Sequence, residues 1–427
     1  MGMNTRATTQ LKLKSVAIIG LGYVGLPTAL ALHNRCRRII GVDVSQDRLD
    51  EIAAHRADLS EPDKVVLNKA LSDGTFEMTT TLATMSQADA VIICVPTPVT
   101  SDNTPDLTPL RSACASAVSY ARPGQILILT STTFVGATTE LLAAPLEDRS
   151  MRVGTDVFVA FSPERIDPGN PEHLQRLTPR VVGGTTARCT AEATRVLRQI
   201  ADVVHPLGSP EVAEAAKLYE NIQRAITLAL ANEFADACRV LDLDPIEVTN
   251  AAATKPYSFL AVKPGPGVGG HCIPVDPHYL LWQLRQHDRS SPLIEQAMTL
   301  IDRRPGQVVA RAEEVLAEAR CPLASARILV AGVTYKPGVR DLRQSSAIRL
   351  IAKLVSAGAD VSYHDPLIPS IRFAGGTMSS TPDPHGKDYD LAIIHTMHPG
   401  VSYDWAGKCV RVLDATYHFT GSQKYIL

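Results

Sequence analysis

The 427-residue chain has the length and composition of a globular protein with two or three domains. Hydrophobic residues make up 45% of it, charged residues make up 20%, and the formal net charge is -2. This balance gives no electrostatic reason to expect nucleic acid or an anionic membrane as a partner. We expect no membrane span, because the apolar run 16–32 is short and interrupted by glycines and a proline. The polar, basic first dozen residues do not resemble a signal peptide.

The eight cysteines are scattered, without a CxxC or any paired ligand spacing. Neither a disulfide framework nor a zinc site is therefore expected, and reduced thiols in the cytoplasm agree best with this pattern. His271 and His278 lie near Cys272, but no further ligands at suitable spacing accompany them. We expect no metal site there.

The first elements predict a dinucleotide-binding unit. A β-branched strand over 15–20 is followed by Gly20-Leu-Gly22-Tyr-Val-Gly25, a helix to about residue 33 and a second strand that ends at Asp43. This is the G-x-G-x-x-G fingerprint in its strand–turn–helix context. Gly20 allows the tight turn, Gly22 lets the pyrophosphate approach the backbone at the helix N-terminus, and Gly25 lets helix and strand pack. Asp43 favours NAD over NADP, because its carboxylate binds the ribose hydroxyls and repels a 2′-phosphate.

Alternating strands and helices continue to about residue 206. Strands are expected over 90–95, 125–129, 157–161 and 203–205, and helices over 105–120 and 188–201. Thr97, Thr132 and Glu164 each follow one of these strands. In parallel sheets ligands bind beyond the carboxyl ends of the strands, so these three side chains predict a site. Each one alone could equally be a polar residue that caps a helix.

The middle of the chain is helical. Residues 211–241 form a long Ala/Leu-rich run without Gly or Pro, and 244–253 form a second helix. A helix of this length usually packs against more than its own domain, so we expect a subunit interface. Lys217 and Asn221 lie four residues apart and hence on one face. A solvated face explains Lys217 alone, whereas the adjacent Asn221 favours a site.

A loop over 264–277 holds four glycines, four prolines and Cys272. The glycines let the backbone approach a ligand closely, and the prolines stiffen it. The loop is therefore suited to present Cys272 as a nucleophile. A connector with a buried cysteine remains the alternative.

A third region begins near residue 307. Helices are expected over 279–286, 292–303, 308–320 and 345–357, strands over 327–331, 360–363, 391–395 and 410–413, and a surface loop over 367–388. The fold class is therefore α/β, with two Rossmann-like parallel-sheet domains joined by a central helical region with a long helix. We place the domain boundaries at 1–206, 207–306 and 307–427.

An ordered set of motifs resembles the UDP-glucose/GDP-mannose dehydrogenase family over nearly the whole chain. The matching segments are Gly20–Pro27, Val95–Pro98, Ser131-Thr132, Ser162–Arg165, Lys217 with Asn221, Gly269–Pro277 and Tyr363–Pro366. The family oxidises C6 of a nucleotide sugar to a carboxylate with NAD. The resemblance implies an NAD-binding first domain, a central dimerisation domain with the catalytic cysteine loop, and a third domain that binds the UDP-sugar.

The resemblance also implies residue roles. Cys272 would form a thiohemiacetal and then a thioester, because a second hydride can leave only from a tetrahedral carbon. Lys217 and Asn221 would stabilise oxyanions at C6, Asp276 and Thr132 would hold water, and Glu164 would act as general acid or base. NAD contacts are expected from Gly20, Gly22, Tyr23, Val24, Gly25, Asp43, Arg48, Pro96, Thr97, Thr132 and Arg343. Substrate contacts are expected from Glu164, Arg165, Lys217, Asn221, Gly269 and Lys336.

Segment 269–277 is most similar to the branch that acts on UDP-N-acetylhexosamines, and Pro274 favours UDP-N-acetylglucosamine 6-dehydrogenases. Sugar supply for polysaccharide biosynthesis and sugar supply for a secondary metabolite both agree with this resemblance. UDP-glucose and UDP-N-acetylmannosamine remain alternative substrates. Pro337 and Gln344 depart from the family pattern and bear on nucleotide contacts. Two alternatives come from other function classes. A two-electron 3-hydroxyacid dehydrogenase would not need Cys272 or the third domain, and a non-catalytic nucleotide-sugar binder would not need the catalytic residues.

Overall fold

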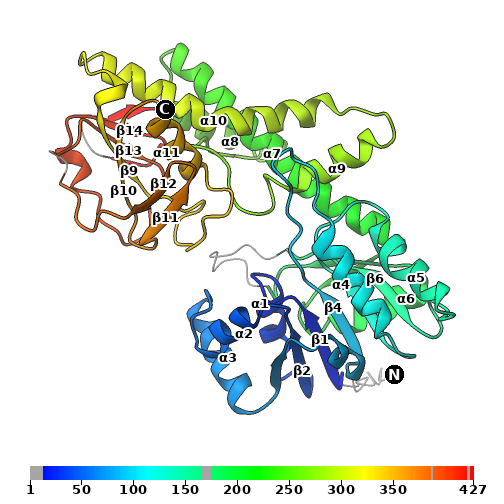
Figure 1. The fold of residues 1–427 in the computed structure, drawn as a ribbon. Coiled ribbons are helices and arrows are strands. Elements are labelled where there is room, and N and C mark those ends of the chain that lie inside the picture. Colours follow the sequence, from blue (N-terminus) through cyan, green and yellow to red (C-terminus); the bar gives the residue numbers. More distant parts are fainter. Residues whose placement is uncertain (1–12, 166–174, 386–387, 421–423) are drawn as a thin grey trace, which may run out of the picture. The chain divides into compact units, whose positions relative to one another are not determined.

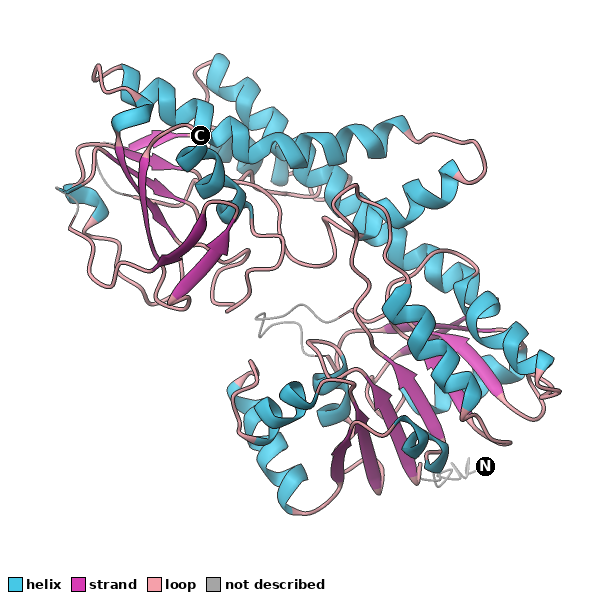
Figure 2. Cartoon of the chain, viewed as in Figure 1, coloured by secondary structure: helices cyan, strands magenta, loops and turns pink. Residues whose placement is uncertain are grey.

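The computed structural model describes residues 13–165, 175–385, 388–420 and 424–427. The chain forms two compact units, Met1–Leu218 and Tyr219–Leu427, that divide within one long helix, α7 (Pro210–Val240). Each unit contains a largely parallel sheet with helices packed on it (Figures 1 and 2). The predicted α/β fold with two parallel-sheet units and a long helix is confirmed.

The first unit contains an eight-stranded sheet in the order β3-β2-β1-β4-β5-β6-β7-β8. All neighbours pair in parallel except β6 and β7, which are antiparallel. The strands are β1 (Ser15–Ile19), β2 (Arg38–Val42), β3 (Phe76–Thr79), β4 (Ala90–Ile93), β5 (Ile126–Leu129), β6 (Phe158–Phe161), β7 (Arg180–Gly184) and β8 (Val204–Leu207). The central strands are short apolar runs because helices cover both faces of such a sheet. The sequence did not predict β3 or β7.

Helices of the first unit contribute apolar faces to this core. In α6 (Ala187–Leu197) the buried residues Cys189, Ala193, Val196 and Leu197 recur at helical spacing, and the Thr186 hydroxyl caps the helix at the Cys189 amide. The other helices are α1 (Gly25–Ala31), α2 (Gln46–Ala53), α3 (Glu61–Ser72), η1 (Leu82–Gln87), α4 (Thr108–Ser119), η2 (Thr139–Ala143) and α5 (Ala144–Asp148). Helices α2 and α3 were not predicted.

Three further helices follow α7: α8 (Pro245–Ala253), α9 (Asp276–Arg285) and α10 (Pro292–Ala317). The prediction of two helices over 292–303 and 308–320 is wrong, because α10 is continuous through Pro305. A proline inside a helix removes one hydrogen bond and disfavours the preceding turn. Burial of Ile301 and Val308 on either side of Pro305 offsets that cost.

The second unit's sheet has the order β10-β9-β13-β14-β15 and is entirely parallel. Its elements are η3 (Leu323–Ser325), β9 (Arg327–Ala331), α11 (Ser346–Ser356), β10 (Asp360–His364), β13 (Leu391–Ile394), η5 (Ala406–Lys408), β14 (Val412–Asp414) and β15 (Lys424–Ile426). The surface loop expected over 367–388 instead contains an antiparallel hairpin of β11 (Ser370–Phe373) and β12 (Gly376–Ser379). No helix in the described ranges is long and apolar enough to cross a membrane.

Candidate active site

The glycine turn after β1 has the geometry that a dinucleotide requires. Gly20 has a φ of +87°, and a Cβ there would lie 2.6 Å from the carbonyl oxygen of Cys94, just after β4. A Cβ on Gly25 would lie 1.8 Å from the Gly20 carbonyl oxygen. A Cβ on Gly22 would meet nothing within 4 Å. Gly20 and Gly25 therefore serve packing, whereas Gly22 borders open space where a pyrophosphate can approach the backbone.

Asp43, at the end of β2, holds the same turn. Its carboxylate accepts hydrogen bonds from the Leu21 amide at 2.8 Å and the Ser45 amide at 2.9 Å. Arg48 Nε donates to the Leu21 carbonyl at 2.9 Å, so Asp43 and Arg48 together bind both backbone polar groups of Leu21. Asp43 thus lies beside the glycine turn, where the fingerprint needs an acid for the ribose.

The β1/β4 boundary is the switch point of the first sheet, because the strand order runs outward from it in both directions. The glycine turn follows β1 with Tyr23 exposed and Val24 half-buried in it, and the segment with Pro96 and the buried Thr97 follows β4. The structure therefore brings the predicted NAD-binding residues of the first unit to one edge of the sheet. Arg343, the remaining predicted NAD contact, belongs to the second unit.

The loop with Thr132 is fixed from helix α7. Glu214 accepts hydrogen bonds from the Gly136 amide at 2.6 Å and from the Thr138 amide and hydroxyl at 2.8 and 2.6 Å. Burial raises the pKa of Glu214 to about 7, against the lowering effect of these bonds. Glu214 was not predicted, although its position one turn before Lys217 could have indicated it.

Glu164 follows β6 and lies in a buried ion pair. Its carboxylate is 7% exposed and accepts from Arg180, which is 1% exposed, and from the Arg165 amide. Lys217 Nζ donates to the Glu164 carbonyl oxygen at 3.2 Å. The predicted residues Glu164, Arg165 and Lys217 therefore lie together. Arg180 was missed, because nothing in the sequence distinguishes it from the chain's other arginines.

In the second unit, the cysteine loop leads directly into α9. Cys272 is exposed, and its carbonyl oxygen accepts from the Val275 amide at 3.1 Å and the Asp276 amide at 2.8 Å. Asp276 is fully buried and accepts a hydrogen bond from the side-chain amide of Asn221 on α7. Cys272, Asp276 and Asn221 are thus brought together. Exposure also excludes the alternative of a buried connector cysteine.

The glycines of this loop pack on the segment after β9. A Cβ on Gly269 would lie 2.7 Å from Tyr335 Cβ and 2.9 Å from the Gln344 carbonyl oxygen. The Gly270 amide donates to the Arg343 carbonyl at 2.8 Å. The Arg343 side chain itself is paired with the buried Asp341 at 2.7 Å. The segment that carries Arg343 therefore supports the loop that carries Cys272.

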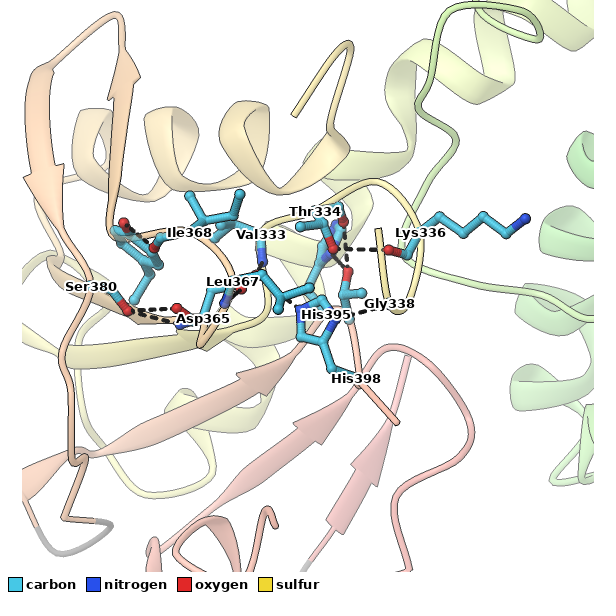
Figure 3. Close-up of polar contacts among 12 residues, drawn as sticks. Val333, Thr334, Lys336, Gly338, Asp365, Leu367, Ile368, Ser380, His395 and His398 are labelled. Atoms are coloured by element: carbon cyan, nitrogen blue, oxygen red, sulfur yellow. Dashed lines mark hydrogen bonds and ion pairs between the residues drawn. The ribbon is translucent and has the colours of Figure 1, made fainter. Parts of the chain in front are cut away.

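A buried network orders the residues around Lys336 (Figure 3). The Gly338 amide donates to His398 Nδ1 at 3.1 Å, so His398 Nε2 carries the proton and donates to Asp365 at 3.1 Å. Asp365 also accepts from the Val333 amide at 2.7 Å. The Lys336 side chain extends away from the network in Figure 3. Asp365 was noted in the sequence only as part of a motif, and His398 was not predicted.

This network lies at the second sheet's own switch point, between β9 and β13. Lys336 follows β9, and His398 follows β13. Within the described ranges, no three His, Cys, Asp or Glu side chains are grouped so that they could hold a metal ion. Each unit thus has a sheet edge of the kind at which nucleotides bind. In the second unit, the loop that carries the exposed Cys272 packs beside that edge.

Comparison with known proteins matches three domains of the UDP-glucose/GDP-mannose dehydrogenase family. The NAD binding domain matches residues 14–201, the central domain matches 211–302 and the UDP binding domain matches 329–420. UDP-N-acetyl-D-glucosamine 6-dehydrogenase of Pseudomonas aeruginosa is 33% identical, with 96% of this chain and 97% of that protein covered. UDP-N-acetyl-D-mannosamine dehydrogenase of Escherichia coli strain K12 is 35% identical, with 80% and 82% covered.

The solved structure of a UDP-D-ManNAc dehydrogenase from Pyrococcus horikoshii superimposes with a TM-score of 0.87 at 28% identity, covering 96% of this chain and 98% of that one. The predicted family and the predicted NAD cofactor are confirmed. The chain therefore belongs to the UDP-glucose/GDP-mannose dehydrogenase family and is an NAD-dependent UDP-sugar dehydrogenase.

Proposed function

We propose that the enzyme oxidises C6 of a UDP-N-acetylhexosamine to the carboxylate, and that UDP-N-acetylglucosamine is its preferred substrate. The observation that carries the four-electron reaction is the exposed Cys272 beside the buried Asn221–Asp276 pair. Pro274 and the similarity to the Pseudomonas aeruginosa enzyme support the N-acetylglucosamine substrate. UDP-N-acetylmannosamine is the second candidate, because the Escherichia coli and Pyrococcus horikoshii relatives carry that name.

NAD, when bound at the glycine turn, supplies a hydride acceptor for each of the two oxidations. Between them, the Cys272 thiolate adds to the C6 aldehyde and forms the C–S bond of a thiohemiacetal. Loss of hydride from C6 leaves a thioester. Water then attacks the thioester carbon, the C–S bond breaks, and the carboxylate and the thiol are released.

Polar residues of both units provide charge and water for these steps. The Lys217 ammonium stabilises the oxyanion that develops at C6, and Asn221 donates a hydrogen bond to it. Asp276 and Thr132 orient the hydrolytic water. Glu164 acts as the general acid or base for thioester hydrolysis, and the buried guanidinium of Arg180 holds its carboxylate in place.

We propose three functional segments along the chain: cofactor binding over 1–206, dimerisation and the cysteine loop over 207–306, and UDP-sugar binding by Lys336 and its neighbours over 307–427. The dimerisation surface is apolar. Leu230 and Phe234 on α7 are 61% and 48% exposed, and they line a groove of about 230 Å³ with Phe259 and Leu260. A second copy of the chain packed on this groove would remove that surface from water.

We also propose that the enzyme works in the cytoplasm and supplies uronic acid precursors for polysaccharide synthesis. All eight cysteines are free, which agrees with a reducing compartment.

Purified enzyme tests the function through its NADH yield and its substrate preference. The proposal predicts two NADH per sugar nucleotide and the highest kcat/KM on UDP-N-acetylglucosamine among the three candidate sugars. Cys272→Ser is expected to stop near the aldehyde, whereas the control Cys321→Ser, in a partly exposed cysteine outside the loop, is expected to retain the full yield. A single NADH from the wild-type enzyme would contradict the four-electron reaction, and a preference for another sugar would contradict only the substrate.

A further inference from the structure

The cysteine loop is held at its first glycine by side chains from two helices. The Gly265 amide donates to Asn232 Oδ1 on α7 at 2.8 Å. The Gly265 carbonyl accepts from Arg304 Nε on α10 at 3.0 Å. Gly265 belongs to no helix or strand, so these two side chains satisfy backbone groups that secondary structure would otherwise pair.

Arg304 is an unusual side chain to find at this place. It is 1% exposed, and its guanidinium forms an ion pair with Asp236 on α7 at 2.7 Å. Burying an ion pair costs as much desolvation as it returns, and an apolar side chain of similar volume would fill the space at lower cost. Arg304 instead orients the loop, because its planar guanidinium donates to Asp236 and to the Gly265 carbonyl at the same time.

The same helix holds both ends of the loop. Asn232 on α7 binds Gly265, and Asn221 on α7 binds Asp276. Eleven residues are about three helical turns, so the two amides project from nearly the same face, about 16 Å apart along the axis. Cys272 lies between these two fixed points. Its location therefore depends on α7 at both ends and on Arg304 at one.

We propose that Asn232 and Arg304 are positioning residues for Cys272, which rests on the proposed role of this thiol as the nucleophile. The first oxidation, from alcohol to aldehyde, does not use the thiol. Thiol addition requires sulfur and carbon about 3–3.5 Å apart, and a misplacement of 1 Å can cost roughly 100-fold in rate. Loosening Gly265 therefore slows the second oxidation and leaves the first one unchanged.

The test uses Asn232→Ala and the paired variant Arg304→Met/Asp236→Leu, which removes both charges of the pair together and so avoids leaving one of them unpaired. Gln307→Ala is the matched control, because Gln307 contacts the same ion pair, donating to Asp236 at 3.1 Å and accepting from Arg304 at 3.4 Å, and has no contact with Gly265 in the described hydrogen bonds. Thermal unfolding identifies the variants that remain folded. Single-turnover NADH formation from the UDP-sugar, and from its separately supplied C6 aldehyde, then measures the two oxidations.

Both loop variants are expected to oxidise the alcohol within about three-fold of wild type and the aldehyde on the order of 10–100-fold more slowly. Trapping with hydroxylamine is expected to recover the accumulated aldehyde, while Gln307→Ala behaves as wild type. Parallel losses in both oxidations, or no loss in either, would overturn the proposal.

The rate of Cys272 alkylation by iodoacetamide, followed by mass spectrometry, separates this result from a failure of the proposed function. If wild-type enzyme makes one NADH, the function is wrong. Positioning still predicts a changed alkylation rate in both loop variants and an unchanged rate in Gln307→Ala. Unchanged rates in the loop variants would overturn the positioning role.

Discussion

Replacement of Glu214 by glutamine tests how helix α7 fixes the loop that carries Thr132. Glu214 is buried, with a pKa raised by that burial to about 7 from an ordinary 4.5. The folded state therefore binds this proton more tightly than the unfolded state does. Its contribution to stability is present below about pH 4.5 and is lost as the pH rises through 7. The difference of about 2.5 pH units corresponds to about 3 kcal/mol.

Glu214→Gln cannot titrate, so the free energy of unfolding of the wild type relative to this variant is expected to fall by most of that 3 kcal/mol between pH 5 and pH 8. Hydrogen exchange of peptides covering 131–143, measured by mass spectrometry in increasing urea, reports on this segment even if the two units unfold separately. Glu211→Gln is the matched control, because Glu211 lies one turn earlier on α7 and accepts from the exposed Thr139 hydroxyl at 2.8 Å.

Activity provides a second measure of the same contact. The glutamine amide can replace only one of the two carboxylate oxygens that accept from Gly136 and Thr138. We expect NADH formation to slow by about 10-fold at pH 8, because the loop is displaced from its position. A pH-independent stability difference, or equal effects of the Glu214 and Glu211 substitutions, would refute the reasoning.

Three other substitutions test the proposed NAD contact, the UDP-binding edge and the subunit interface. Asp43→Ser removes the carboxylate that disfavours a 2′-phosphate, so the ratio of kcat/KM for NAD to that for NADP is expected to fall at least 10-fold; an unchanged ratio would count against Asp43 as the ribose ligand. His398→Ala leaves the buried Asp365 and the Gly338 amide without this partner, and calorimetry is expected to show about 10-fold weaker UDP binding with unchanged NAD binding. Equal weakening of both ligands would indicate general destabilisation. Leu230→Asp places a charge in the apolar groove, and light scattering is expected to show a monomer for the variant and the proposed dimer for the wild type; a dimeric variant would exclude the groove as the interface.

The parts of the fold that sequence analysis predicted are those encoded locally. The strand, glycine turn and second strand ending at Asp43 form one contiguous pattern, and Lys217 and Asn221 share a helix face because of their spacing alone. Cys272 could be singled out because the glycines and prolines around it leave few other roles for the loop. In each case neighbouring residues in sequence carry the whole signal.

The parts that sequence analysis missed depend on distant residues. Arg180 meets Glu164 only because β7 turns back antiparallel to β6. The proline in α10 appeared to end a helix, since the burial that offsets it becomes evident only in the folded chain. His398 contacts Asp365 although the two residues are 33 positions apart in the chain. Single-sequence patterns do not encode such pairings.

In both sheets a glycine follows the first strand at the switch point, and the carbonyl oxygen that it faces comes from a different residue in each sheet. Gly332 follows β9 with a φ of +79°, and a Cβ there would lie 2.0 Å from the Thr396 carbonyl oxygen after β13. Gly20 has the same relation to Cys94 after β4, with a φ of +87°. In both sheets a glycine lets the chain leave the first strand at the switch point without striking the neighbouring strand.

The second turn has Thr334 and Pro337 where the spacing of the first turn would place its later glycines. Asp365 and His398 order its backbone through hydrogen bonds, and Lys336 offers a positive charge where the first turn offers bare amides. Two diphosphate-containing ligands can therefore be bound at equivalent sheet edges by different means. That difference explains why the glycine fingerprint identifies only the NAD site, although the chain has a second edge of the same kind.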